Sequence, residues 1–362
     1  MRKITNFEVL LDADDVLIDC NEYALKLLEE KNHCTYSIDH VTDWGYLGIP
    51  EDERLSFLND PAFYRTQPAI PGAADFLKEL LSMANVTIMT AVYPQFMGER
   101  IERLTKLFPF FPMQNIIMGH RKEMVQADVM LDDGVHNLLS SGASLPVLFR
   151  RPWNRKASGI CCVNDYNDFL SLVRIMQGNR EQINRMPKVL CIVGPSGSGK
   201  HPFADELCMD AAFEQVRTYT TAPFCGHNHH VTPEEFQKML DQGHFLEATY
   251  FCSERYGLPL SDIDAALSRG KHAVAVMDIS GCMSVYNHYP DQALILYIDR
   301  DKRGCVHSIL SKPGISREDQ VDRILAIDLE QKNRILADEV LQTPSNNDYR
   351  SLVAHVKSLV VS

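Results

Sequence analysis

A short apolar run near the start of the chain ends in two carboxylates that are spaced two residues apart. Residues 7–11 read Phe-Glu-Val-Leu-Leu, and Asp12 and Asp14 come directly after. A strand that delivers two carboxylates to its C-terminal end builds a site where Mg²⁺ and phosphate can meet. In such a site Asp12 can act as the nucleophile and Asp14 as the proton donor. Strand-end aspartates also cap loops and helices, so the interpretation as a phosphate site depends on matching residues later in the chain.

Further polar side chains stand at the ends of later apolar runs. Thr90 and the pair Asp132-Asp133 each close such a run, and Lys122 stands between them. Open parallel α/β sheets bind their ligands at the carboxyl ends of the strands, so we expect these residues to meet. Thr90 would supply a hydroxyl donor and Lys122 a fixed cation for a phosphate. The expected metal ligands are Asp12, Asp14, Asp132 and Asp133.

Length, charge and cysteine content bound the class of protein. A chain of 362 residues is too long for one ordinary core, so two domains are the default. The net charge of −12 repels a nucleic acid polymer but tolerates a small anion held by a local cation. Ten scattered cysteines without a CxxC spacing indicate reduced thiols, and no apolar run reaches a membrane-spanning length. We therefore expect a cytoplasmic protein without a membrane segment.

The pattern of apolar runs predicts an α/β fold class with two domains. The first domain, at 1–178, alternates helical stretches with strands expected at 7–11, 86–89, 128–131 and 146–149. An insertion at about 18–72 is too long for a loop and mostly helical in pattern, with helices expected at 23–31 and 51–58. It is therefore expected to form a cap over the site, and a helix at 165–176 is expected to close the domain.

A polar stretch at 179–187 is poor in apolar side chains and favours a linker. The second domain, at 188–362, begins with a strand-like run at 188–193. Later strands are expected at 273–277 and 293–298, and helices at 233–242, 260–269 and 316–334. Both domains are expected to have mainly parallel sheets.

The first domain resembles the haloacid-dehalogenase-like phosphatases, whose motifs run Asp-x-Asp, Thr or Ser, Lys, and Asp-Asp. It is most similar to their 5′(3′)-deoxyribonucleotidase branch, on the motifs at 11–17, 88–90, 127–133 and 149–154 (Phe-Arg-Arg-Pro-Trp-Asn). The resemblance implies a Rossmann-like parallel sheet with a helical cap. It also implies Mg²⁺-dependent hydrolysis of (deoxy)nucleoside monophosphates through an aspartyl-phosphate. The chain departs from the branch at Asp15, where Gly is usual, and Arg121 offers a second cation beside Lys122.

A glycine-rich loop opens the second domain. Residues 194–200 read Gly-Pro-Ser-Gly-Ser-Gly-Lys, which fits the first seven positions of GxxxxGK[ST] between a strand and a helical pattern. Backbone N–H groups of such a loop cradle phosphates, so ATP or another nucleotide is the expected ligand. The predicted nucleotide-binding residues are Gly194, Ser196, Gly197, Ser198, Gly199 and Lys200. The eighth position is His201, and an imidazole is a poor Mg²⁺ ligand beside a hydroxyl.

Downstream of this loop, residues 188–345 resemble guanylate kinase. The matching motifs are Thr220-Thr221, Phe245-Leu-Glu247, Tyr256-Gly257, Met277-Asp-Ile279 and Val321-Asp-Arg323. The resemblance implies an acceptor and kinase site formed by Thr218, Glu247, Tyr256, Asp278 and Arg323. By it, Glu247 would face a purine base, Tyr256 the monophosphate and Arg323 the donor phosphates. The family's Arg after the Thr pair is Ala222 here, and a second acceptor-loop Arg is also missing.

Our hypothesis is a 5′-nucleotidase-like phosphatase fused to a guanylate-kinase-like domain. One alternative makes nucleoside monophosphate phosphorylation the main activity and the phosphatase an accessory. Another makes the second domain a nucleotide-binding regulatory unit without catalysis, because phosphoryl transfer depends on cations that are missing here. Cys225, His227, His229 and His230 match no zinc template and are interpreted as a polar loop. Base preference, sugar preference and oligomeric state are left open.

Overall fold

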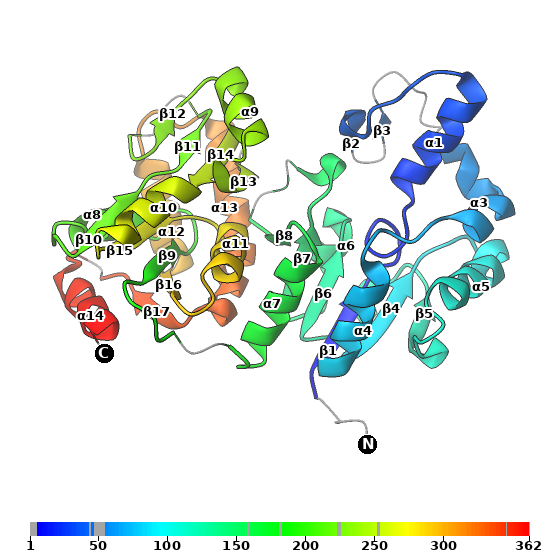
Figure 1. Ribbon diagram of the computed structural model, residues 1–362, viewed down its shortest axis with the longest axis horizontal. Helices are drawn as coiled ribbons and strands as arrows, with labels where there is room; N and C mark the ends of the chain where they lie inside the picture. The colour runs from blue at the N-terminus through cyan, green and yellow to red at the C-terminus, as the bar shows by residue number, and fades with distance from the viewer. Residues whose placement is uncertain are drawn as a thin grey trace. The chain divides into compact units, whose positions relative to one another are not determined.

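The computed structural model describes residues 6–42, 45–46, 55–155, 157, 159–180, 183–222, 226–251, 254–344 and 346–361 (Figure 1). The chain folds into two compact units. The N-terminal unit comprises residues 1–155 and 162–170, and the C-terminal unit comprises residues 156–161 and 171–362. The division passes through α7 (Tyr166–Met176), the helix expected to close the first domain. The linker at 179–187 therefore stays a proposal, and its residues 181 and 182 lie outside the described part.

A six-stranded sheet forms the centre of the N-terminal unit, in the order β5-β4-β1-β6-β7-β8. Its strands are β1 (Glu8–Leu11), β4 (Asn85–Thr90), β5 (Ile116–Met118), β6 (Val129–Asp132), β7 (Leu145–Phe149) and β8 (Cys161–Val163). β1 pairs in parallel with both β4 and β6, so three strands end side by side. The four strands expected from the sequence are present. All residues of β6 and β7 are buried, as a sheet covered on both faces requires.

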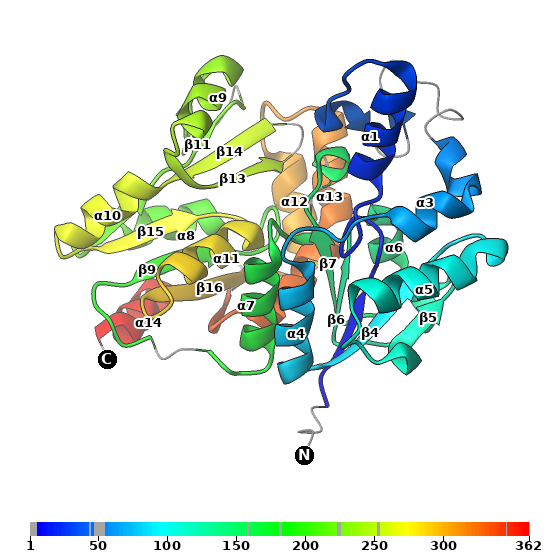
Figure 2. The same ribbon diagram turned by 45° about the vertical axis from the view of Figure 1, so that its right-hand side comes forward.

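Helices cover this sheet and extend beyond the ends of its strands. They are α1 (Asn21–Asn32), α3 (Pro61–Thr66), α4 (Ala73–Met83), α5 (Met97–Leu107) and α6 (Val135–Ser140). Figure 2 shows α1 and α3, which belong to the predicted cap, beyond the C-terminal end of β1. The cap also contains the short strands β2 (Val41–Thr42) and β3 (Gly45–Tyr46). Of the helix expected at 51–58, residues 51–54 lie outside the described part, and Ser56–Asn59 form a 3₁₀ turn.

The C-terminal unit has a parallel sheet in the order β10-β15-β9-β16-β17. Its strands are β9 (Val189–Val193), β10 (Phe213–Val216), β15 (His272–Val276), β16 (Ala293–Asp299) and β17 (Glu339–Gln342). A second, four-stranded sheet was not predicted. It consists of β11 (Tyr219–Thr220), β12 (His229–His230), β13 (Phe245–Phe251) and β14 (Glu254–Pro259). Its antiparallel pairs β11–β14 and β13–β14 correct the expectation that the sheets of this unit are all mainly parallel.

Several helices of the C-terminal unit begin at a residue whose side chain caps the first turn. They are α8 (Lys200–Leu207), α9 (Pro233–Asp241), α10 (Leu260–Ser268), α11 (Ile279–His288), α12 (Lys302–Ser311), α13 (Arg317–Lys332) and α14 (Arg350–Val361). Thr232 and Glu235 form a capping box at α9, and the Ser316 side chain accepts the N–H of Asp319 at α13. The helices expected at 233–242, 260–269 and 316–334 are confirmed. None of the helices in the described ranges combines the length and apolar character that spanning a bilayer requires.

Candidate active site and nucleotide-binding loop

The ends of β1 and β6 bring three carboxylates together in the N-terminal unit. Asp12 follows β1, and its backbone N–H donates to the carbonyl of Leu131, so it lies beside the end of β6. Carboxylate oxygens of Asp12, Asp132 and Asp133 lie within 4.8 Å of one another. Among the described residues, this is the one group of acidic, histidine or cysteine side chains arranged closely enough to share a metal ion. The Asp14 side chain, one of the four expected ligands, is not part of the group.

Lys122 lies between two of these carboxylates. Its Nζ is 2.7 Å from Asp12 Oδ1 and 2.6 Å from Asp132 Oδ2, and the side chain is almost fully buried. Burial alone would lower the pKa of Lys122, but the two carboxylates outweigh it and raise that pKa above its ordinary value. Burial raises the pKa of Asp12 to about 7, against the opposing effect of the Lys122 ammonium. The lysine is therefore a fixed positive charge in a site crowded with acids.

The two aspartates at the end of β6 are oriented by neighbouring donors. The backbone N–H of Gly134 donates to Asp132 Oδ1 at 2.7 Å, and the Asn137 side-chain amide donates to the same oxygen at 3.1 Å. Trp153 Nε1 donates to Asp133 Oδ2 at 2.7 Å. Burial raises the pKa of Asp133 well above its ordinary value, and nearby carboxylates add to the shift. Asn137 was not predicted, whereas Trp153 lies in a motif that carried the family resemblance.

Asp14 belongs to a second part of the site, which faces α5. Thr90, fully buried at the end of β4, has its Oγ1 3.5 Å from Asp14 Oδ2. Arg100 Nη2 donates to Asp14 Oδ1 at 2.7 Å. Sequence reasoning missed Arg100, because a charged residue on an amphipathic helix normally points to solvent. Arg121, considered as a second cation, is instead exposed and pairs with Glu123.

Asp15, the departure from the usual Gly, has a structural role at the start of α1. Its φ of 54° lies in the left-handed region, which Gly adopts freely and Asp tolerates better than most residues. Its Oδ1 accepts the backbone N–H groups of Cys20 and Asn21 at 3.0 Å, and its Oδ2 accepts the Asn21 side-chain amide at 2.6 Å. Burial raises the pKa of Asp15 to about 7.

In the C-terminal unit, the glycine-rich loop lies between β9 and α8 as expected. Gly197 and Gly199 have φ values of 81° and 98°. A Cβ at Gly197 would lie 2.5 Å from the carbonyl oxygen of Cys305, and one at Gly199 would collide with the Tyr349 hydroxyl. Both positions therefore require glycine for backbone conformation and for close approach.

The lysine of the loop donates its hydrogen bonds to carbonyl groups of the same loop. Lys200 Nζ donates to the carbonyl oxygens of Gly194 and Pro195, the latter at 3.0 Å. Burial lowers the pKa of Lys200, although the nearby Glu330 carboxylate opposes the shift. Glu330 Oε2 accepts the backbone N–H of Ser196 at 2.8 Å. Ser198, also predicted to bind phosphate, is fully buried within the loop.

His201 stacks on another histidine. Its ring centroid is 4.7 Å from that of His227, with an interplanar angle of 18°. Burial lowers the pKa of His201 to about 3, with the Lys200 charge adding to the effect, so the imidazole is neutral. Cys225, weighed as a zinc ligand, lies outside the described part, and His229 and His230 are exposed. Across the described residues, no metal-ligand group contains any of these histidines.

The predicted acceptor residues lie on several elements of the C-terminal unit. Glu247 is buried on β13, and a Cβ at Gly281 would lie 3.2 Å from its Oε2, so it faces the first turn of α11. Asp278 caps that helix by accepting the N–H of Gly281. Tyr256 pairs with Thr220 in the small sheet. Thr218 precedes β11, and Arg323 lies on α13 and acts electrostatically on Lys200.

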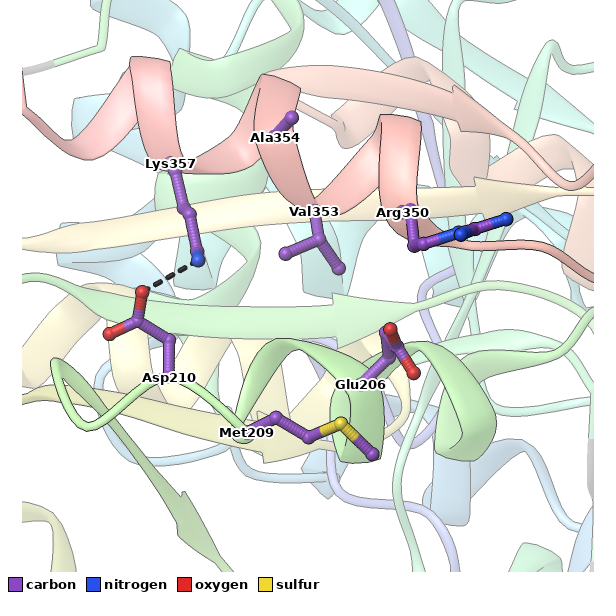
Figure 3. A pocket seen from close by; sticks show the side chains of 7 residues that line it. All are labelled: Glu206, Met209, Asp210, Arg350, Val353, Ala354 and Lys357. Carbon is purple, nitrogen blue, oxygen red and sulfur yellow. Dashed lines mark ion pairs between the residues drawn. The ribbon is translucent and has the colours of Figure 1, made fainter.

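A groove elsewhere in this unit does not involve these residues. It lies between α8 and α14 and is lined by Glu206, Met209, Asp210, Arg350, Val353, Ala354 and Lys357 (Figure 3). Lys357 Nζ and Asp210 Oδ2 pair across it at 2.6 Å. None of the predicted site residues lines the groove.

In the comparisons with known proteins, the two parts of the chain match two different families. Residues 6–178 match the family described as 5′ nucleotidase, deoxy (Pyrimidine), cytosolic type C protein. Residues 186–360 match the guanylate kinase family. The chain is thus a nucleotidase-like unit fused to a guanylate-kinase-like unit, and both resemblances drawn from the motifs are confirmed. The first unit is of the phosphoric monoester hydrolase class.

Individual relatives each match one of the two units. A 5′(3′)-deoxyribonucleotidase of Bacillus subtilis (strain 168) is 28% identical over 170 residues, covering 44% of this chain and 94% of that protein. A guanylate kinase of Chlamydia pneumoniae is 33% identical over 118 residues, covering 30% of this chain and 58% of that protein. The crystal structure of guanylate kinase from Anaplasma phagocytophilum overlaps 50% of this chain and 88% of that chain, at 14% identity and a TM-score of 0.39.

Proposed function

We propose that the N-terminal unit hydrolyses (deoxy)nucleoside monophosphates, with Asp12 as the nucleophile. The observation that carries this proposal is the contact of one buried lysine with two carboxylates at the ends of adjacent parallel strands. A site with a nucleophilic oxygen beside a fixed cation is suited to attack on a phosphate ester. The 5′(3′)-deoxyribonucleotidase similarity supports a nucleotide as the substrate.

The residues can divide the reaction into two balanced steps. An Asp12 carboxylate oxygen forms a bond to phosphorus while the ester P–O bond breaks, and Asp14 gives its proton to the leaving oxygen. Asp14 then takes a proton from water as that water attacks phosphorus, which releases inorganic phosphate and restores Asp12. The Lys122 ammonium and the Thr90 hydroxyl would donate to the phosphate oxygens. We assign these roles to Asp12, Asp14, Thr90 and Lys122.

The residues present fit a magnesium ion. Mg²⁺ prefers oxygen ligands and binds through one or two carboxylates together with substrate phosphate, and the group of Asp12, Asp132 and Asp133 offers such oxygens. When bound, the ion would neutralise charge on the carboxylates and on the phosphate.

The replacement Asp12→Asn tests the proposal. It keeps the size of the side chain but removes the nucleophilic charge, so Mg²⁺-dependent phosphate release from nucleoside monophosphates should fall to background. Asp75→Asn is the matched control, because it makes the same chemical change at an exposed position of α4 and should leave phosphate release unchanged. An unchanged rate in Asp12→Asn would refute the nucleophile. A screen of all monophosphates would identify the preferred base and sugar.

We further propose that the C-terminal unit binds a nucleotide at residues 194–200, with ATP as a candidate. The intact left-handed glycines and the buried Lys200 support binding. The missing acceptor arginine at Ala222 argues for weak phosphoryl transfer, because that reaction depends on positioned cations. Calorimetry with ATP tests binding, and ATP consumption that depends on an added monophosphate and is lost in Lys200→Ala tests transfer. A cytoplasmic location without membrane or nucleic acid partners completes the proposal.

A further inference from the structure

A buried arginine in α5 has a single polar contact within the described part of the N-terminal unit. Arg100 is 1% exposed, and its Nη2 donates to Asp14 Oδ1 at 2.7 Å. Its Nε and Nη1 are also buried and have no hydrogen-bond partner among the residues that the structure describes. Burying a guanidinium is costly unless it is well paired. The buried positive charge of Arg100 is therefore compensated by a direct contact with one carboxylate oxygen.

The surroundings of Arg100 hold the guanidinium in place. Its Cζ lies 5.3 Å from the ring centroid of Tyr64 in α3, and that ring stacks on Phe96 at 5.2 Å. The Tyr64 hydroxyl donates to the carbonyl oxygen of Leu58, which further fixes the ring. A cation over an aromatic face in a dry environment is stabilised and restricted in its motion. The guanidinium is thus a rigid partner for Asp14.

We propose that Arg100 is a positioning residue that fixes the carboxyl group of Asp14 for proton transfer to the leaving group. Arg100 holds Oδ1, which leaves Oδ2, the oxygen nearer Thr90, to face the reacting phosphate ester. The inference rests on the proposed function, because it needs Asp14 as the proton donor. It adds a residue outside the four motifs, contributed by the helix that packs against α3.

The effect of losing Arg100 should depend on the leaving group of the substrate. A nucleoside leaves as a poor, strongly basic alkoxide and needs a proton from a well-aligned acid. Nitrophenolate leaves as a stable anion and needs no proton in the first step. Arg100→Met should therefore slow nucleoside monophosphate hydrolysis, while the rapid burst of nitrophenolate from nitrophenyl phosphate stays close to that of the wild type. A misplaced acid costs kcat and leaves the substrate's KM nearly unchanged.

The matched control is Arg103, one turn further along α5. Its Nε donates to the carbonyl oxygen of Gln67 at 2.6 Å and its Nη2 to that of Thr66 at 3.1 Å, so it links α5 to α3 without touching Asp14. Arg103→Met removes a comparable side chain and a comparable link between the helices. Any effect of this substitution on the rate should be the same for the two substrates.

A double-mutant cycle on the intact chain gives the decisive test. Asp14→Asn, Arg100→Met and the double variant are compared with the wild type for nucleoside monophosphate kcat. We expect Arg100→Met to lower kcat by about 100-fold in the wild type and by less than about threefold in the Asp14→Asn background. Arg100→Lys, which keeps a cation, should recover part of the loss and guards against a folding defect.

The outcomes distinguish this inference from the proposed function. Equal losses in both backgrounds, or an equal loss of the nitrophenolate burst, would overturn the positioning role of Arg100. Full activity in Asp12→Asn would instead overturn the proposed function, whatever the Arg100 variants do. Loss of all activity in Asp12→Asn together with an additive cycle would leave the nucleotidase standing and remove Arg100 from its mechanism.

Discussion

Replacing Lys122 with methionine is expected to destabilise the N-terminal unit strongly. Methionine keeps the unbranched shape of the lysine stem, so the main loss is the ammonium group that contacts Asp12 at 2.7 Å and Asp132 at 2.6 Å. Removing one partner of a buried ion pair leaves a desolvated charge and typically costs about 3–5 kcal/mol. Asp132 is fully buried, so water cannot compensate. A loss of this size is a large fraction of the stability of an ordinary domain.

The pH dependence of this loss follows from Asp12. Burial already raises the pKa of Asp12 to about 7 in the folded protein, above the ordinary value of 3.8, and removing the ammonium raises it further. A carboxyl group whose folded pKa is raised favours the folded state at low pH, and this stability is lost as the pH rises through the folded pKa. The deficit of Lys122→Met should therefore be greatest above pH 7 and shrink towards pH 5.

Urea unfolding followed by tryptophan fluorescence measures this unit selectively. Both tryptophans of the chain, Trp44 and Trp153, precede residue 156 and belong to the N-terminal unit. Lys78→Met is the matched control, because Lys78 pairs with Asp75 on the exposed face of α4. The free energy of unfolding of this variant should be close to that of the wild type. A loss below about 1 kcal/mol in Lys122→Met, or an equal loss at both pH values, would refute the reasoning.

Three further predictions concern the two phosphate sites. Asp15→Ala should be less stable than Asp15→Gly by about 1 kcal/mol in the same unfolding assay, because both lose the same hydrogen bonds and only alanine keeps the strained left-handed backbone. Equal stabilities would show that the φ of 54° carries no strain. Mg²⁺ should raise the free energy of unfolding of the wild type by about 2.7 kcal/mol at 100 times its Kd, and should have little effect on that of Asp132→Asn. His201→Ser places a hydroxyl at the metal-ligand position of the loop. The ratio of the ATP Kd without Mg²⁺ to that with Mg²⁺, measured by calorimetry, should rise about tenfold. No change would show that the stacked imidazole is not what limits metal binding.

The carboxylates of the first site could be predicted because their signal is local. Asp12 and Asp132 each end a buried apolar run, and the parallel pairing of β1 and β6 brings the two ends together. The function of Asp15 was harder to predict. Its left-handed backbone follows from the family's usual Gly, but its hydrogen bonds to Cys20 and Asn21 depend on where α1 begins.

Other parts of the sites depend on tertiary structure and had no sequence signal. Arg100 lies in a helix whose pattern is that of an ordinary amphipathic surface, and only the packing of α5 buries it beside Asp14. In the small sheet, β11 and β12 have two residues each, too few to show an alternating pattern, so their place in that sheet had no sequence signal. The stack of His201 on His227 joins a helix to a loop 26 positions later in the numbering of the chain.

The two lysines explain why the units are expected to differ in chemistry. Lys122 is held by carboxylates, which keep it charged and place it beside the proposed nucleophile and the three carboxylates that could share a metal ion. Lys200 is held by neutral carbonyl oxygens, and burial lowers its pKa. A phosphate is a better partner for an ammonium than a carbonyl oxygen is, so exchanging one for the other favours nucleotide binding. Transfer of a phosphoryl group needs more cations around the acceptor, and Ala222 supplies none. This contrast supports our proposal that the C-terminal unit binds a nucleotide more effectively than it phosphorylates one.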